Sequence, residues 1–111
     1  MKMAEYILKI LKSQIVVMWS WGAHNFIAID DGLEFLVQGF KFKGTVRVKY
    51  NGGNDLFDIT FLKGWTPIET IEGIYLDSLV RTIDNYVEVT EDYEKRIELE
   101  YKVIYNGKVL Y

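Results

Sequence analysis

The chain of 111 residues contains no cysteine, one proline and one histidine, His24. The lack of cysteine excludes disulfides, thiolate nucleophiles, iron–sulfur clusters and cysteine-ligated zinc. A single histidine excludes a multi-histidine metal site within one chain. We therefore expect no metal and no cofactor. A small domain without disulfides or a structural metal fits a reducing cytoplasm.

Long apolar runs are also missing. None reaches the roughly 18 residues that a membrane-spanning helix needs, so we expect no membrane partner. The apolar residues near the N-terminus are interrupted by Glu5, Lys9 and Lys12, which is not the pattern of a secretion signal. No low-complexity segment occurs, so disorder is not expected outside the termini.

Core-forming residues are plentiful. Apolar residues make up 50% of the chain, aromatic residues 15% and charged residues 26%, with a net charge of −3. This length is typical of one domain. We predict a single domain over 1–111, with a loose tail at 104–111.

The first part of the chain predicts one helix followed by a strand. Apolar residues at helical spacing (Met3, Ile7, Ile10) indicate an amphipathic helix over 2–13. The β-branched run Ile15–Val17 then favours an extended segment over 15–21. The alternative is that the helix continues to Met18.

The middle of the chain predicts antiparallel strands. Asp30-Asp31-Gly32 between apolar runs at 26–29 and 33–37 is a hairpin signal, because Gly accepts positive φ and Asp tolerates it. Residues 40–50 alternate, and Gly44 within them suggests a bulge or a bend. A turn at 51–54 leads to a returning strand over 56–62. The inward set is Phe40, Phe42, Val46, Val48 and Tyr50, and the outward set is Lys41, Lys43, Thr45, Arg47 and Lys49.

The last part of the chain predicts helices. Thr66-Pro67-Ile68-Glu69 has the N-cap residue, the first-turn proline and the third-position acid of a helix start. Because Gly73 disfavours a helix interior, the start at Thr70 is the alternative, with the helix reaching Val87 in either case. Residues 90–103 fit a helix, or a hairpin that turns at Asn106-Gly107. The predicted fold class is α+β: an N-terminal helix, an antiparallel sheet of four or five strands, and one or two C-terminal helices packed on one face.

Two groups of side chains are candidate sites. On a strand, Trp19 and Trp21 share a face beside His24 and Asn25, and these four residues form a candidate ligand-binding platform. The alternative is that both indoles belong to the core. The second candidate is the cationic side of the alternating segment, where Lys41, Lys43, Arg47 and Lys49 offer a polyanion-binding stripe.

The sequence shows no recognisable catalytic constellation. Ser20, His24 and either Asp30 or Asp31 include the residue types of a hydrolase triad, but no G-x-S-x-G segment holds the serine on a sharp turn. The segments Asp30-Asp31-Gly32 and Asn51-Gly52-Gly53-Asn54-Asp55 are turn sequences that match neither a calcium loop nor a phosphate loop. We predict a protein that is not an enzyme and has no metal site.

Several segments together resemble a known group of proteins. They are W-S-W-G-A-H-N-F, G-L-E-F-L-V-Q-G-F-K-F-K-G-T-V-R-V, D-L-F-D-I and T-I-E-G-I-Y-L-D-S-L-V-R-T-I-D. Over roughly residues 15–95 the chain is similar to short uncharacterised proteins of gut anaerobes and their phages or mobile elements. The resemblance implies an intracellular protein with an accessory role in a mobile element, and it assigns no catalytic residue.

Three functional hypotheses follow. The first is a non-enzymatic binding or adaptor domain that recognises a protein partner, with a homodimer as one form, because tyrosines are abundant and interfaces favour them. The alternative is binding of nucleic acid or another polyanion through the cationic strand, against which the acidic net charge and Asp58 on the neighbouring strand both argue. The third is small-ligand binding near Trp19, Trp21 and His24.

Overall fold

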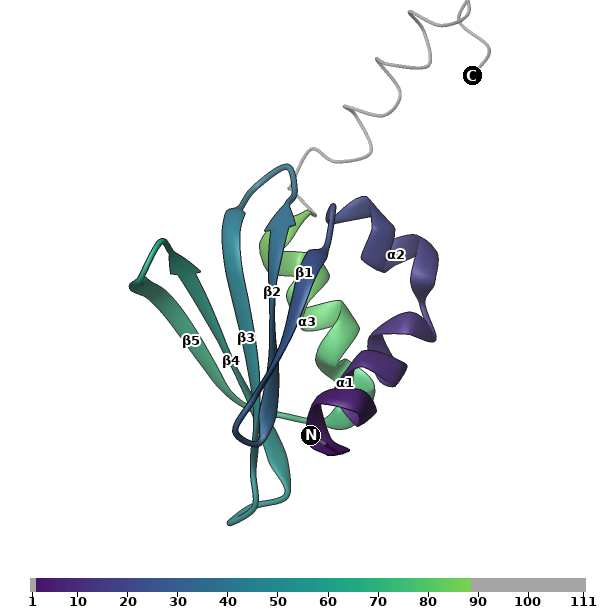
Figure 1. Cartoon of the computed structure of the whole chain (residues 1–111), viewed down its shortest axis with the longest axis vertical. Coiled ribbons are helices and arrows are strands. Elements are labelled where there is room, and N and C mark those ends of the chain that lie inside the picture. The colour runs from purple at the N-terminus through teal and green to yellow at the C-terminus, as the bar shows by residue number, and fades with distance from the viewer. Residues whose placement is uncertain (1, 89–111) are drawn as a thin grey trace, which may run out of the picture.

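The computed structural model describes residues 2–88, and the predictions for 90–103 and 104–111 lie outside these residues. Two short helices precede a five-stranded sheet, and one helix follows it (Figure 1). This is the predicted α+β class. The elements are α1 (Lys2–Lys12), α2 (Ile15–Ser20), β1 (His24–Ile29), β2 (Gly32–Gln38), β3 (Lys43–Asn51), β4 (Leu56–Lys63), β5 (Thr66–Ile74), the 3-10 turn η1 (Leu76–Ser78) and α3 (Leu79–Val87).

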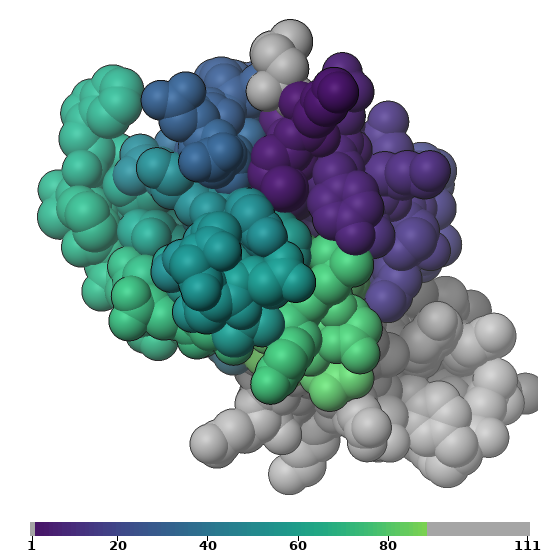
Figure 2. Space-filling view, turned by 90° about the horizontal axis from the view of Figure 1, so that it is seen from below, coloured from purple at the N-terminus to yellow at the C-terminus, as the bar shows by residue number. Residues whose placement is uncertain are grey.

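The sheet is an antiparallel meander in which each strand pairs with the next in the order β1-β2-β3-β4-β5. The helices gather on one side of it, as the view from below also shows (Figures 1 and 2). Within residues 2–88 no helix covers the opposite side, which we call the uncovered face. Strands β1 to β4 present there Asn25, Ile27, Glu34, Leu36, Lys43, Thr45, Arg47, Lys49, Asp58, Thr60 and Leu62.

The core lies between the other face of the sheet and the helices. Helix α1 contributes Ala4, Ile7 and Leu11, which recur at the three- and four-residue spacing of one helical face. Helix α3 contributes Leu79, Val80, Ile83 and Val87 in the same way. They meet the alternating side chains of the strands, among them Phe35, Val46, Val48, Ile59 and Phe61.

An aromatic cluster attaches α3 to the sheet. The Tyr86 ring stacks on Phe61 at a centroid distance of 3.8 Å and meets the edge of Phe42 at 5.4 Å. Burial raises the pKa of the Tyr86 phenol, and the charge of Glu69 raises it further.

The alternation over 43–50 has the predicted register: Val46 and Val48 are fully buried, and Arg47 and Lys49 lie on the uncovered face. The strand does not begin at Phe40, however. Residues 39–42 form a loop that is held by α3, because the Lys41 and Phe42 amides both donate to the Val87 carbonyl. Lys41 is therefore not part of β3.

Gly44 does not form the bulge that its position suggested. The pairing of β3 with β2 is continuous through Gly44, and the pairing with β4 begins at the next residue, Thr45. A Cβ at Gly44 would lie 2.4 Å from the Leu62 carbonyl oxygen, so this residue permits a close approach of the two backbones.

The prediction of a strand over 15–21 is wrong, because Ile15–Ser20 is helical. The β-branched preference is worth only a few tenths of a kcal/mol per residue. Helical spacing brings Met18 and Trp21 into the core, and the Trp21 Nε1–H donates to Asp84 Oδ1 on α3 at 2.8 Å. Packing thus outweighs the local preference.

The predicted helix that starts at Thr66 or Thr70 is wrong over 66–74, where β5 lies, and right over 79–87, where α3 lies. Strand β5 is an edge strand, so Pro67 needs no partner for the amide hydrogen that it lacks. Gly73 has φ +70°, which a helix interior does not allow. The Thr-Pro-x-Glu pattern is therefore accommodated by a strand.

Candidate functional site

The structure does not bring the proposed ligand platform together. Trp21 is fully buried, whereas Trp19 lies on α2 with 67% of its surface exposed. His24 Nδ1 lies 2.7 Å from the Gly22 carbonyl oxygen, and Asn25 has φ +55° in the bulge of β1. The shared face of the two indoles required a strand, and the helix separates them.

The cationic stripe is shorter than predicted and partly neutralised. Lys43, Arg47 and Lys49 share the uncovered face, but Lys41 lies in the preceding loop. Arg47 Nε donates to Glu34 Oε1 at 2.9 Å across the β2–β3 pair. Lys49 lies opposite Asp58 on β4.

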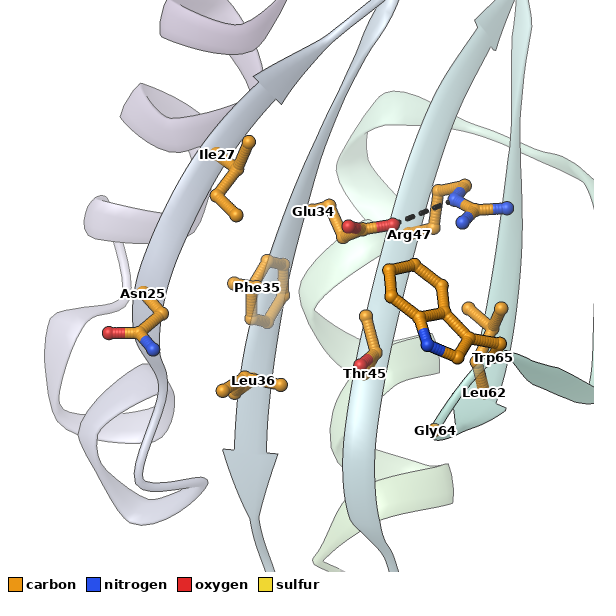
Figure 3. Close-up of a pocket in the computed structure, with 10 residues that line it drawn as sticks. All are labelled: Asn25, Ile27, Glu34, Phe35, Leu36, Thr45, Arg47, Leu62, Gly64 and Trp65. Atoms are coloured by element: carbon orange, nitrogen blue, oxygen red, sulfur yellow. Dashed lines mark hydrogen bonds and ion pairs between the residues drawn. The ribbon is translucent and has the colours of Figure 1, made fainter.

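The uncovered face also carries a groove that the sequence did not indicate. It has a volume of about 350 Å³ and extends from β1 to the β4–β5 turn (Figure 3). Its apolar lining comes from Ile27, Leu36, Leu62 and Trp65, and its polar lining from Asn25, Thr45, Glu34 and Arg47.

Two rows of paired residues cross the groove. In the first, Leu36, Thr45 and Leu62 lie opposite one another on β2, β3 and β4. In the second, Ile27, Glu34 and Arg47 lie opposite one another on β1, β2 and β3. An apolar row therefore runs beside a row that ends in an ion pair.

Trp65 stands at one end of the groove, in the tight turn between β4 and β5. Gly64 precedes it with φ +61°, the left-handed conformation that this turn requires. Figure 3 shows the indole over β3, beside Thr45 and near Arg47. The Trp65 surface is 93% exposed, although the neighbouring Leu62 is only 3% exposed.

The groove is thus bordered by large apolar side chains that face water. Ile27 is 55% exposed, in addition to Trp65 at the other end. Leu62 is buried, yet it does not belong to the core cluster on the other face of the sheet. Apolar surface that collects on one face in this way is typical of interaction sites.

The sequence offered one weak signal for this site, the Gly64-Trp65 pair. Because residues 66–69 have the pattern of a helix start, the sequence did not predict the hairpin of β4 and β5 that contains Trp65. The Glu34–Arg47 pair is separated by 13 positions, so only the strand register reveals it.

The groups with raised pKa values lie away from the groove. Burial raises the pKa of the Glu88 carboxyl just after α3, and a hydrogen bond to Asp55 raises the pKa of the Tyr50 phenol. Among residues 2–88 no cluster of three or more His, Cys, Asp or Glu side chains is placed to hold a metal ion.

No helix in the described part of the chain has the length and apolar character needed to cross a membrane. No family model, no curated protein and no solved structure matches the chain.

Proposed function

We propose that this chain is a binding domain that holds a segment of a protein partner on its uncovered sheet face. The observation that carries the proposal is Trp65, an indole 93% exposed at the end of an apolar groove. Tryptophan and arginine are the side chains most enriched among the residues that dominate binding energy in protein interfaces. This groove has one of each, Trp65 and Arg47.

The width of the apolar surface favours a protein segment over a small molecule. The exposed apolar side chains of the groove extend from Ile27 on the edge strand β1 to Trp65 in the β4–β5 turn. A small ligand is usually enclosed by its site over most of its surface. An open face that spans the sheet suits a partner that lies across it.

Both edges of the sheet are irregular, which argues against binding by strand addition. The β1–β2 register shifts between His24 and Ile27, and the β4–β5 register shifts twice, next to Pro67 and next to Gly73. Bulges and proline are the features by which sheets prevent edge pairing. The face, rather than an edge, is the surface available to a partner.

The test compares two exposed tryptophans. Trp65→Ala removes the proposed anchor, and Trp19→Ala removes an indole on α2, in the helix layer, as the matched control. Because both side chains are mostly in water, each change should alter the free energy of unfolding by about 0.5 kcal/mol or less. Affinity capture from the native cells should recover a partner with wild type and Trp19→Ala and lose it with Trp65→Ala. Equal recovery with Trp65→Ala would contradict the proposal.

Polyanion binding is the second candidate, because Lys43 and Lys49 lie on the same uncovered face. Its strength is limited by the pairing of Arg47 with Glu34.

A further inference from the structure

We infer that the segment bound on the uncovered face is an extended peptide in which an acidic residue lies close to a large apolar one. The apolar side chain enters the groove beside Trp65, and the carboxylate binds the Arg47 guanidinium. This inference rests on the proposed function and names the chemistry of the partner.

The groove suits one large apolar side chain. Neighbouring strands lie about 4.8 Å apart, so the row from Leu36 to Leu62 spans about 10 Å. The volume of about 350 Å³ has room for one large apolar side chain together with the neighbouring atoms of its segment. The middle of the row is Thr45, whose small side chain leaves the space that Leu36, Leu62 and Trp65 border.

Arg47 has hydrogen-bonding capacity left for a carboxylate. A guanidinium has five N–H donors. Within residues 2–88 only its Nε donates, to Glu34, and the side chain is 34% exposed at the border of the groove. Figure 3 shows the other two guanidinium nitrogens pointing away from Glu34. Two parallel N–H groups of this kind bind a carboxylate with both oxygens.

Charge on the uncovered face favours an acidic partner. On this face Lys43, Arg47 and Lys49 supply three positive charges, and Glu34 and Asp58 supply two negative ones. One Asp58 oxygen already accepts a hydrogen bond from the Gly73 amide at 3.1 Å. The whole chain, by contrast, has a net charge of −3. An acidic segment is therefore favoured on this face more than the net charge of the whole chain would suggest.

A library of random peptides displayed on phage and selected on the full chain tests the inference. We expect the selected peptides to be enriched in Asp or Glu within two positions of Leu, Ile, Val, Phe or Trp. Synthetic copies should bind Trp65→Ala and Arg47→Met at least about tenfold more weakly than wild type, a loss of about 1.4 kcal/mol. Arg81→Met, which removes an exposed arginine on α3, is the matched control and should leave affinity unchanged.

Glu34→Gln is the second variant, because Arg47→Met also removes packing. It retains the guanidinium and deletes the carboxylate that competes for it, so acidic peptides should bind this variant at least as tightly as wild type. Weaker binding to Glu34→Gln overturns the inference.

The other outcomes separate this inference from the proposed function. Selected peptides that require Trp65 but contain no excess of acids, and that bind Arg47→Met normally, overturn the inference and leave the proposed function in place. Peptides that bind Trp65→Ala as well as wild type, or a selection without enrichment, overturn both.

Discussion

Glu88 is the one charged residue that is buried in the described part of the chain, with 5% of its surface exposed. It follows α3, and its Oε2 accepts the Phe40 amide at 3.4 Å. Burial raises the pKa of this carboxyl above 4.5, and the nearby charge of Asp84 adds to the rise, while the hydrogen bond from Phe40 opposes it. The folded protein therefore disfavours the ionised form.

This residue predicts a pH-dependent stability. A carboxyl whose pKa is raised in the fold stabilises the protein below pH 4.5, and that contribution is lost as the pH rises through the raised value. Glu88→Gln stays neutral at every pH and keeps an oxygen that can accept the Phe40 amide. We expect the variant to be more stable than wild type at pH 7, with the difference shrinking towards zero in acid, as measured by urea unfolding across the pH range.

The matched control is Glu72→Gln, which neutralises an exposed acid on β5. Its effect on the free energy of unfolding should be within about 0.5 kcal/mol at either pH. A Glu88→Gln variant less stable than wild type at pH 7 would show that the ionised carboxylate is needed by the fold.

At the scale of elements, the sequence was informative where one side of an element is buried and the other is solvated. Strand β3 alternates because Val46 and Val48 face the helices while Arg47 and Lys49 face water, and this contrast is visible in single residues. The amphipathic pattern of α1 is recognisable for the same reason. In such elements, local pattern and tertiary packing agree.

The two wrong elements are those in which local preference and packing disagree. Ile15–Ser20 has β-forming residues in a helix, and Thr66–Ile74 has a helix-start sequence in a strand. What decides each case is distant in sequence: Asp84 receives the Trp21 indole, and β4 pairs with β5. The groove depends on the pairing register of the strands, so the sequence did not predict it. Three of the four predicted cationic residues, Lys43, Arg47 and Lys49, do lie on the uncovered face.

Gly32 connects two elements at the start of β2 and provides a test at this scale. The preceding turn residue Asp31 takes the left-handed conformation, with φ +55°, and Gly32 instead permits close approach, since its Cβ would lie 2.1 Å from the Val48 carbonyl oxygen. Backbone cannot yield as a flexible side chain does, so Gly32→Ala should destabilise the fold by about 1–3 kcal/mol.

Urea unfolding of Gly32→Ala measures this loss, with Gly52→Ala as the matched control. A Cβ at Gly52 would meet its nearest neighbour at 3.7 Å, an ordinary contact, and the change should cost about 0.5 kcal/mol or less. Equal stability of the two variants would mean that β2 and β3 do not approach as closely as described.

At the scale of the whole molecule, charge separates the two candidate functions. The sequence alone allows four phosphate contacts, from Lys41, Lys43, Arg47 and Lys49, and hence a slope of about −3.6 in log K against log salt for duplex DNA. In the structure Lys41 lies outside the strand and Arg47 is paired with Glu34. Lys43 and Lys49 remain, and two contacts give a slope of about −1.8.

We therefore expect only weak binding of labelled duplex DNA, measured by fluorescence anisotropy at several salt concentrations, with a slope no steeper than about −1.8. Lys43→Gln combined with Lys49→Gln should abolish it, and Lys2→Gln combined with Lys9→Gln, on α1 in the helix layer, should not. A slope near −3.6 would mean that Arg47 leaves Glu34 for a phosphate and that the loop at 39–42 brings Lys41 into line with β3. A slope that steep would make nucleic acid, rather than a protein segment, the natural occupant of the uncovered face.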